Sequence, residues 1–224
     1  MENRKTTPNG RRPQKRRQEI LDAAAQVFYE RGYDASSTQD IADVVGILKG
    51  SLYYYVDSKE QFLYEIIKEA HDLGLAILEE VRDADGDVVD RFTLLIRRHA
   101  QYFVANRVKV SVFFREFSAL SPEHRQDIDQ LGHMYREFVE DLIREGQATG
   151  EVATSIDPGL AGITIVEMLN SLARWYNPDG KATVDDITDL LVNVVLGGVI
   201  SVEARERRGG DDAFRTSLRS SAST

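Results

Sequence analysis

The sequence predicts an all-α fold of about nine helices, in which an N-terminal helix-turn-helix domain of three helices precedes a larger helical domain. Apolar residues recur at spacings of three and four along most of the 224 residues, which is the period of an amphipathic helix. Glycine, proline and short Ser/Thr/Asp clusters divide these stretches. No stretch reads convincingly as a β-sheet strand.

The composition argues against several classes of protein. The chain holds no cysteine, so we expect neither a disulfide framework nor a thiolate metal site. No apolar stretch approaches the roughly 20 residues of a membrane span. The Arg/Lys-rich start lacks the apolar segment of a signal peptide. We therefore expect a cytoplasmic protein with no membrane partner, no cofactor and no bound metal.

Charge is divided unevenly along the chain. The formal net charge is −9, yet residues 1–17 hold seven Lys/Arg against one Glu. Residues 1–60 sum to +1 and residues 61–224 to −10. The basic start supplies a local field that attracts phosphate, while the acidity elsewhere keeps most of the surface away from nucleic acid. Because many solvated termini are basic, this charge indicates DNA binding only together with the motif that follows.

The first helix is expected over residues 14–31, after a polar arm at residues 1–12 that we expect to be disordered. Apolar residues fall on one face of this helix, namely Ile20, Ala24, Val27 and Phe28. Gly32 then offers the left-handed residue that commonly ends a helix.

Two short helices are expected next, over residues 38–45 and 48–54. Candidate N-caps stand before the first of them: Ser36, Ser37 and Thr38. Gln39 and Asp40 are placed to return a capping-box bond. Gly46 permits the positive φ of the turn between the two helices. We expect a shared core made of Ile41, Val45 and Leu52.

A long helix is expected over residues 58–82, opened by the capping box Ser58-Lys59-Glu60-Gln61. At 1.5 Å per residue it spans roughly 35 Å, long enough to belong to both halves of the molecule. The further helices are expected at residues 88–106, 108–119, 122–148, 158–176 and 184–205. The resulting domains are a helix-turn-helix domain at 13–60, a second helical domain at 61–206 and a disordered tail at 207–224.

Two short helices around a glycine turn have the geometry that brings the second helix into the major groove of DNA. Outward-facing residues are expected on that second helix: Lys49, Gly50, Ser51, Tyr53 and Tyr54. Lys49 can reach a phosphate or a guanine edge, and tyrosine hydroxyls suit phosphate oxygens. The alternative is that the tyrosines only pack the small domain, but three consecutive tyrosines cannot all point inward on one helix.

The segment from Arg17 to Ile67 resembles the N-terminal domain of the TetR family of transcriptional regulators. It matches almost throughout the family pattern of a helix ending in Phe and Gly, then T-x-x-D-I-A, then G-x-L-Y-x-H-F-x-S-K-E. Tyr55 and Val56 depart from the usual His and Phe, and Ile47-Leu48 removes a usual hydroxyl cap. With the basic arm, the resemblance implies these contacts to an operator in double-stranded DNA: Arg16, Arg17, Thr38, Lys49, Gly50, Ser51, Tyr53, Tyr54, Tyr55 and Lys59.

The second domain is expected to bind a small-molecule effector in an apolar site with a few polar groups. Candidate lining residues are Phe92, His99, Tyr102, Phe103, Phe113, Phe114, Phe117, Tyr135 and Trp175. For each of them, ordinary core packing is the alternative. The segments 174–181 and 195–198 are similar to TetR members that respond to acyl-CoA thioesters. That similarity implies an acyl-CoA effector, with Arg97, Arg98 or Arg115 as candidates to meet its phosphates.

The last two helices are apolar around much of their girth, which predicts a homodimer built on a four-helix interface. The predicted interface residues are Leu160, Ile163, Leu169, Ile187, Leu191, Val194 and Val195. The alternative is that these side chains fill the core of a single subunit.

The sequence thus predicts a ligand-responsive repressor that binds its operator as a dimer and is released by a hydrophobic or acyl-CoA-type ligand. A transcriptional activator and a ligand-buffering module of the same fold are alternatives. A helical enzyme acting on thioesters is a further one, but no nucleophile–base pair or paired carboxylates support it. We expect no catalytic residue.

Overall fold

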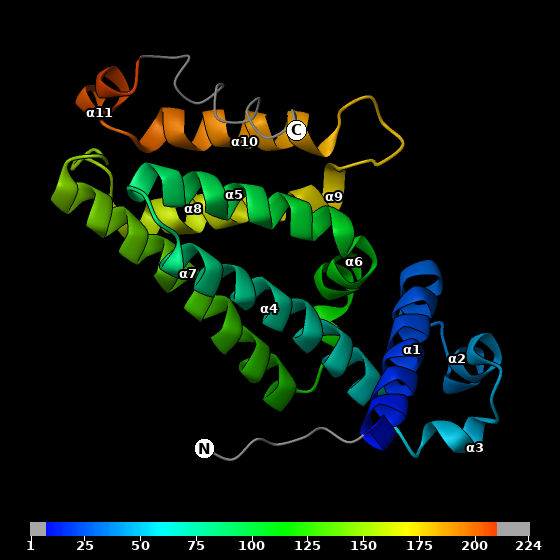
Figure 1. The fold of residues 1–224 in the computed structure, drawn as a ribbon. Helices are drawn as coiled ribbons and strands as arrows, with labels where there is room; N and C mark the ends of the chain where they lie inside the picture. The colour runs from blue at the N-terminus through cyan, green and yellow to red at the C-terminus, as the bar shows by residue number, and fades with distance from the viewer. Residues whose placement is uncertain (1–7, 210–224) are drawn as a thin grey trace. The chain divides into compact units, whose positions relative to one another are not determined.

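The computed structural model describes residues 8–209 of the chain, and every helix that the sequence predicts has a helical counterpart there, with bounds that differ in places (Figure 1). In this part of the chain the one β-type pairing is an isolated bridge between Val152 and Ile200. The prediction of an all-α fold is confirmed. Contacts divide the chain into an N-terminal unit, residues 1–71 with 107–129, and a C-terminal unit, residues 72–106 with 130–224.

The N-terminal unit contains the first three predicted helices together with residues 107–129, which come later in the chain. Its elements are α1 (Pro8–Arg31), α2 (Thr38–Val45), α3 (Lys49–Leu52), the start of α4 (Lys59–Asp83), α6 (Arg107–Glu116), the 3-10 turn η1 (Phe117–Ala119) and the start of α7 (Pro122–Thr149). Helix α1 packs against both α2 and α6, and α2 packs against α3. The helix-turn-helix therefore shares its unit with α6, which lies far along the sequence.

Helix α1 begins earlier than the sequence predicts. Residues 8–12, expected in a disordered arm, belong to the helix, while residues 1–7 lie outside the described range. The helix ends as expected, because Gly32 takes a φ of 82° and donates its N–H to the carbonyl of Phe28 at 2.9 Å. All four apolar residues predicted on its inner face are buried.

The C-terminal unit is organised around α5. Its elements are the rest of α4, α5 (Val88–Ala105), the rest of α7, α8 (Pro158–Asn170), α9 (Leu172–Trp175), α10 (Val184–Val199) and α11 (Val202–Arg207). Helix α5 packs against α10 on one side and against α8 and α9 (Figure 1). Apolar side chains from these helices form the core, with Phe92, Leu95, Ile96, Leu169 and Val192 all almost fully buried.

The last two predicted helices are each split. The helix expected over 158–176 breaks at Ser171, whose hydroxyl donates to the carbonyl of Met168 at 2.6 Å. The helix expected over 184–205 ends at Val199 because the next residues turn to pair with the loop at 151–153. Ala153 N–H donates to the carbonyl of Val199 at 3.1 Å, and Ser201 N–H to that of Glu151 at 2.9 Å. These bonds replace the helical ones.

The predicted tail is anchored at its first residues. Arg208 forms ion pairs with Asp87, the N-cap of α5, and with Asp90 at 3.2 Å. Residues 207–209 are therefore ordered, and residues 210–224 lie outside the described range. Among the described helices, none combines the length and apolar character needed to cross a membrane.

Candidate nucleic-acid interface

Local capping fixes the start of α2. Ser37 is the N-cap, and its hydroxyl accepts the N–H of Asp40 at 3.3 Å while the Asp40 carboxylate accepts the N–H of Ser37 at 2.7 Å. The hydrogen bonds from Ser37 lower the pKa of Asp40. This reciprocal pair is the predicted capping box. Gly46 then ends α2 at a φ of 72°, which places α3 across the predicted turn.

The outer side of α3 and of the residues that flank it is exposed to solvent. Ile41, Ala42 and Leu52 are fully buried between the helices, whereas the predicted core residue Val45 is only half-buried. On the outer side Tyr54 is 90% exposed, Leu48 80% and Tyr53 48%. The helix is shorter than predicted, since residues 53–55 form turns, and its N-cap Leu48 makes no side-chain cap bond.

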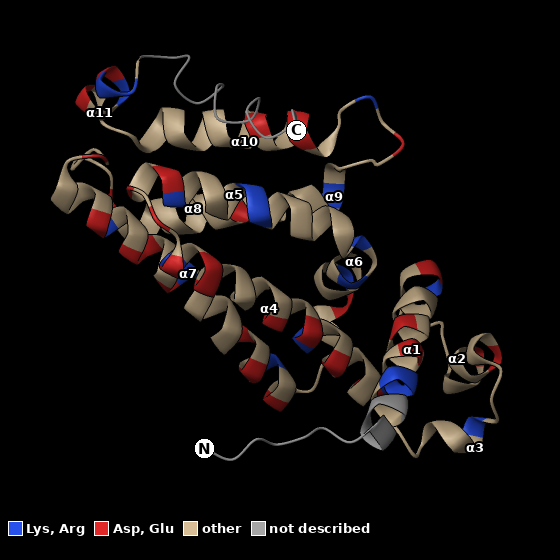
Figure 2. Cartoon of the chain, in the orientation of Figure 1, with Lys and Arg blue, Asp and Glu red and all other residues tan. Residues whose placement is uncertain are grey.

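The other predicted DNA contacts differ in accessibility. Lys49 and Gly50 are exposed, Ser51, Tyr55 and Lys59 are half-buried, and Thr38 is 9% exposed. The Lys59 ammonium lies 4.1 Å from the ring centroid of Tyr33, a cation–π contact that holds the lysine near the start of α4. Figure 2 shows Lys and Arg in blue on α1, α3 and α6 of this unit.

The two predicted arginines of α1 have partners within the unit. Arg16 pairs with Glu19 at 2.8 Å and donates to the carbonyl of Val45 at 3.4 Å. Arg17 forms an ion pair with Glu65 of α4. Both arginines remain at least partly exposed, so a phosphate can compete for them.

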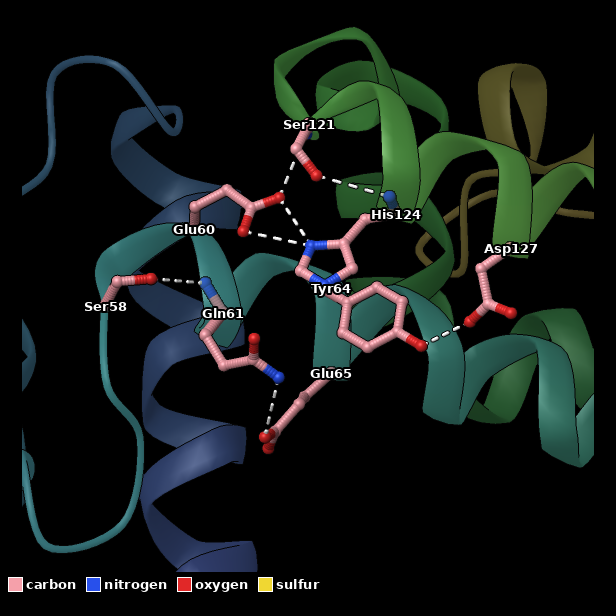
Figure 3. Close-up of polar contacts among 8 residues, drawn as sticks. All are labelled: Ser58, Glu60, Gln61, Tyr64, Glu65, Ser121, His124 and Asp127. Atoms are coloured by element: carbon pink, nitrogen blue, oxygen red, sulfur yellow. Dashed lines mark hydrogen bonds and ion pairs between the residues drawn. The ribbon is translucent and has the colours of Figure 1, made fainter.

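The start of α4 is held by contacts that the sequence analysis did not foresee (Figure 3). The Glu60 carboxylate accepts the N–H of Ser121 at 3.0 Å and contacts Nδ1 of His124 at 2.8 and 3.0 Å. The His124 ring stacks on Tyr64, with centroids 3.8 Å apart, and the Tyr64 hydroxyl donates to Asp127. We call these five residues the α4–α7 clamp.

Electrostatics favour the charged form of Glu60 in this clamp. Burial of the carboxyl opposes ionisation, but the hydrogen bonds from Ser121 and His124 outweigh burial and leave the pKa of Glu60 below its usual value. The predicted reciprocal bond of Gln61 does not form. Its N–H donates to Ser58 Oγ at 3.0 Å, while its side chain donates to Glu65 at 3.3 Å (Figure 3).

Helix α6 is tied to the same unit by basic side chains. Lys109 pairs with Asp22 of α1 at 2.7 Å and with Glu69 of α4 at 2.8 Å. Arg115 donates to the carbonyl of Tyr29 at 2.9 Å. These contacts connect α6 to α1, the helix that packs against α2.

The predicted effector residues fall into separate groups. His99, Tyr102, Phe103 and Tyr135 form a chain of ring contacts in the C-terminal unit. Phe113, Phe114 and Phe117 form another in the N-terminal unit. Phe92 is 1% exposed and belongs to the core, and Trp175 is 50% exposed, with its indole N–H donating to Ser171 at 2.9 Å. Arg97 and Arg98 are paired with Asp189 and Glu80.

The predicted dimer residues divide by burial. Leu160, Ile163 and Val194 are 46–70% exposed. Leu169, Ile187, Leu191 and Val195 are at most 5% exposed because they pack inside the subunit, so they are core residues rather than interface residues. Within the described residues, no group of three His, Asp or Glu side chains is placed to hold a metal ion.

A capped short helix, a glycine turn and an exposed second helix, joined to a helical second unit, define a helix-turn-helix DNA-binding protein. Family models match both halves: bacterial regulatory proteins of the tetR family over residues 20–66, and the tetracyclin repressor-like C-terminal domain over residues 85–199. The chain belongs to the TetR family of bacterial transcriptional regulators, which confirms the predicted family.

Relatives and solved structures agree with this assignment. The HTH-type transcriptional repressor KstR2 of Rhodococcus jostii (strain RHA1) is 32% identical, covering 83% of this chain and 92% of the relative. The ketosteroid transcriptional regulator KstR2 of Mycobacterium tuberculosis superposes with a TM-score of 0.77 at 28% identity, covering 83% and 95% of the two chains. AibR in complex with isovaleryl coenzyme A and operator DNA gives 0.72 at 28% identity, covering 80% and 97%.

Proposed function

We propose that the chain is a repressor that acts in the cytoplasm, binds operator DNA as a homodimer and is released by an acyl-CoA-type ligand. The exposed surface of α3 carries the DNA-binding part of this proposal. An aromatic side chain that is 90% exposed, as Tyr54 is, contributes nothing to the subunit's own core. Tyr54 and the exposed Lys49 supply side chains suited to phosphates and base edges.

The proposed DNA contacts rank by accessibility. Lys49, Gly50, Tyr53 and Tyr54 lie on the exposed surface and make the primary set. Ser51, Tyr55 and Lys59 are half-buried at its edge, and Arg16 and Arg17 reach phosphates by exchanging their carboxylate partners. Thr38 contributes least, since 9% of it is exposed.

The exposed apolar side chains of the C-terminal unit support dimerisation. Leu160 and Ile163 lie one turn apart on α8, and Leu190 and Val194 lie one turn apart on α10. We call these four residues the α8/α10 face. Rows of large exposed apolar residues are uncommon on the surface of a monomeric protein. Pairing both helices with those of a second copy would bury them in a four-helix interface. A dimer also supplies the two recognition helices that successive major grooves require.

Relatives supply the reason for an acyl-CoA-type effector. AibR was solved with isovaleryl coenzyme A and operator DNA, and KstR2 is named a ketosteroid regulator. The aromatic groups around His99 and around Phe113 supply apolar surface of the kind an acyl chain needs. Ligand binding lowers operator affinity only by its differential affinity for the two states of the dimer.

For the domains, we propose that residues 13–60 bind DNA and residues 61–206 bind the ligand and form the dimer. Helix α6 and the start of α7 pack with the DNA-binding segment, so they are the parts of the second domain best placed to pass a ligand signal.

A gel-shift titration tests the proposal. The wild-type chain is titrated against its own upstream intergenic DNA, alone and with a panel of acyl-CoA thioesters. Lys49→Ala is expected to weaken the specific shift, and Lys181→Ala, an exposed lysine of the other unit, is the matched control. Release of the shift by a thioester supports the full proposal. A shift that every thioester leaves intact removes the effector class and keeps the regulator.

A further inference from the structure

The interior of the C-terminal unit contains a histidine that the protein itself satisfies on one side only. His99 of α5 is 4% exposed, and its Nδ1 lies 2.9 Å from the hydroxyl of Tyr135 on α7. Its other ring nitrogen, Nε2, is buried without a hydrogen-bond partner. The ring stacks on Phe103 with centroids 4.2 Å apart. A buried polar atom, on a ring that stacks against Phe103, is therefore left without a hydrogen bond.

Such an atom needs an explanation, because leaving a buried donor or acceptor unpaired costs about 1–3 kcal/mol. Among the described residues the other buried nitrogen in this condition is Nε of Arg91, and that guanidinium is already ion-paired with Glu145. His99 has no charged partner of this kind. A leucine or phenylalanine at the same position would pack without the cost.

The protonation state of His99 follows from its surroundings. Burial lowers the pKa of His99 to about 3, so the ring is neutral at physiological pH. Burial raises the pKa of the Tyr135 phenol, which keeps its proton. A phenol O–H is a good donor and an imidazole nitrogen a good acceptor, so Tyr135 donates to Nδ1 and the ring proton sits on Nε2. The unpaired atom is thus an N–H donor.

We propose that His99 Nε2 donates to a carbonyl oxygen on the acyl part of the effector. This inference rests on the proposed function, since it specifies one contact of an acyl-CoA ligand. A neutral donor in an aromatic surround fits a carbonyl, whereas a carboxylate or phosphate would enter this apolar interior as an unpaired charge. Tyr135 acts as a positioning residue by holding the proton on Nε2.

Ligand pairs that differ at the carbonyl test this contact. Binding of octanoyl-CoA, 3-oxo-octanoyl-CoA and the thioether S-octyl-CoA is measured by calorimetry with the wild-type protein and with His99→Phe. The wild type is expected to prefer the carbonyl-bearing ligands about tenfold, the worth of one hydrogen bond. His99→Phe is expected to lose that preference. His133→Phe, which changes an exposed histidine of α7, is the matched control and keeps it.

Two ligand-free measurements protect the test against a variant that misfolds. Replacing both partners of the His99–Tyr135 hydrogen bond, in a His99→Phe/Tyr135→Phe double variant, should leave the thermal midpoint unchanged or raise it. A drop of several degrees would mean that Nε2 is satisfied inside the protein, by a trapped water for example, and would overturn the proposal. Nitrogen-15 NMR of histidine-labelled protein should show the His99 proton on Nε2, and Tyr135→Phe should abolish that preference.

The outcomes distinguish failure of the His99–carbonyl contact from failure of the acyl-CoA effector class. If all three ligands bind the wild type equally well, the carbonyl contact is wrong and the acyl-CoA effector stands. If none binds, the acyl-CoA class fails and the contact fails with it.

Discussion

Replacing Leu160 with glutamate tests the homodimer and its interface together. Leu160 lies at the start of α8 and is 70% exposed in the subunit. Fully burying a leucine is worth about 1.5–3 kcal/mol, so covering the exposed part contributes roughly 1–2 kcal/mol. A two-fold interface buries the residue twice, which makes roughly 2–4 kcal/mol per dimer before the cost of two buried carboxylates. The dimer Kd should therefore rise by at least about thirtyfold.

Sedimentation velocity over a concentration series measures this change. The matched control is Val202→Glu, because Val202 of α11 is 68% exposed but lies outside the α8/α10 face. Leu160→Glu should keep the helical circular dichroism of the wild type, since the side chain adds little to the subunit core. Its operator affinity should fall with dimerisation. A variant that dimerises as tightly as the wild type, or a control that weakens the dimer equally, would refute the interface.

Four further substitutions, all in the N-terminal unit, give three more tests. Lys49→Ala and Tyr53→Phe should each weaken operator binding in a gel shift without changing the sedimentation of the dimer, and unchanged affinity in both would remove these side chains from the contact set. Ser37→Ala should lower the free energy of unfolding by about 1 kcal/mol through loss of the α2 cap, measured by urea unfolding; no loss would mean that the capping box contributes nothing. Because the pKa of Glu60 is lower in the folded state than in the unfolded state, the ionised carboxylate stabilises the fold at pH values above its unfolded pKa. This stabilisation is lost as the pH falls through the folded pKa. The thermal midpoint of Glu60→Gln should therefore fall less on acidification towards pH 3 than that of the wild type, and parallel curves would contradict the clamp.

Most helices were predictable because their signals are local. The cap at Ser37, the positive φ at Gly32 and Gly46, and the apolar spacing of α1 each depend on residues within one or two turns. The split after Val199 was not predictable in this way, because it arises from backbone pairing with residues 151–153, nearly fifty positions earlier.

The candidate sites were less predictable than the helices. Glu60 and His124 stand 64 positions apart, and nothing in either neighbourhood marks them as a pair. The sequence showed that the last helices are rich in apolar residues. Their periodicity did not distinguish Leu191, which packs inside the subunit, from Val194, which lies on the surface.

The sequence by itself thus determined the helical segments, the helix-turn-helix and the TetR resemblance, because these depend on neighbours along one helix and on a contiguous motif. The tertiary structure alone decided which apolar residues remain exposed and which charges pair across helices. It also decided that Nε2 of His99 lies buried without a partner. Burial and hydrogen bonding depend on how segments distant in sequence pack together, and a one-dimensional pattern does not contain that information.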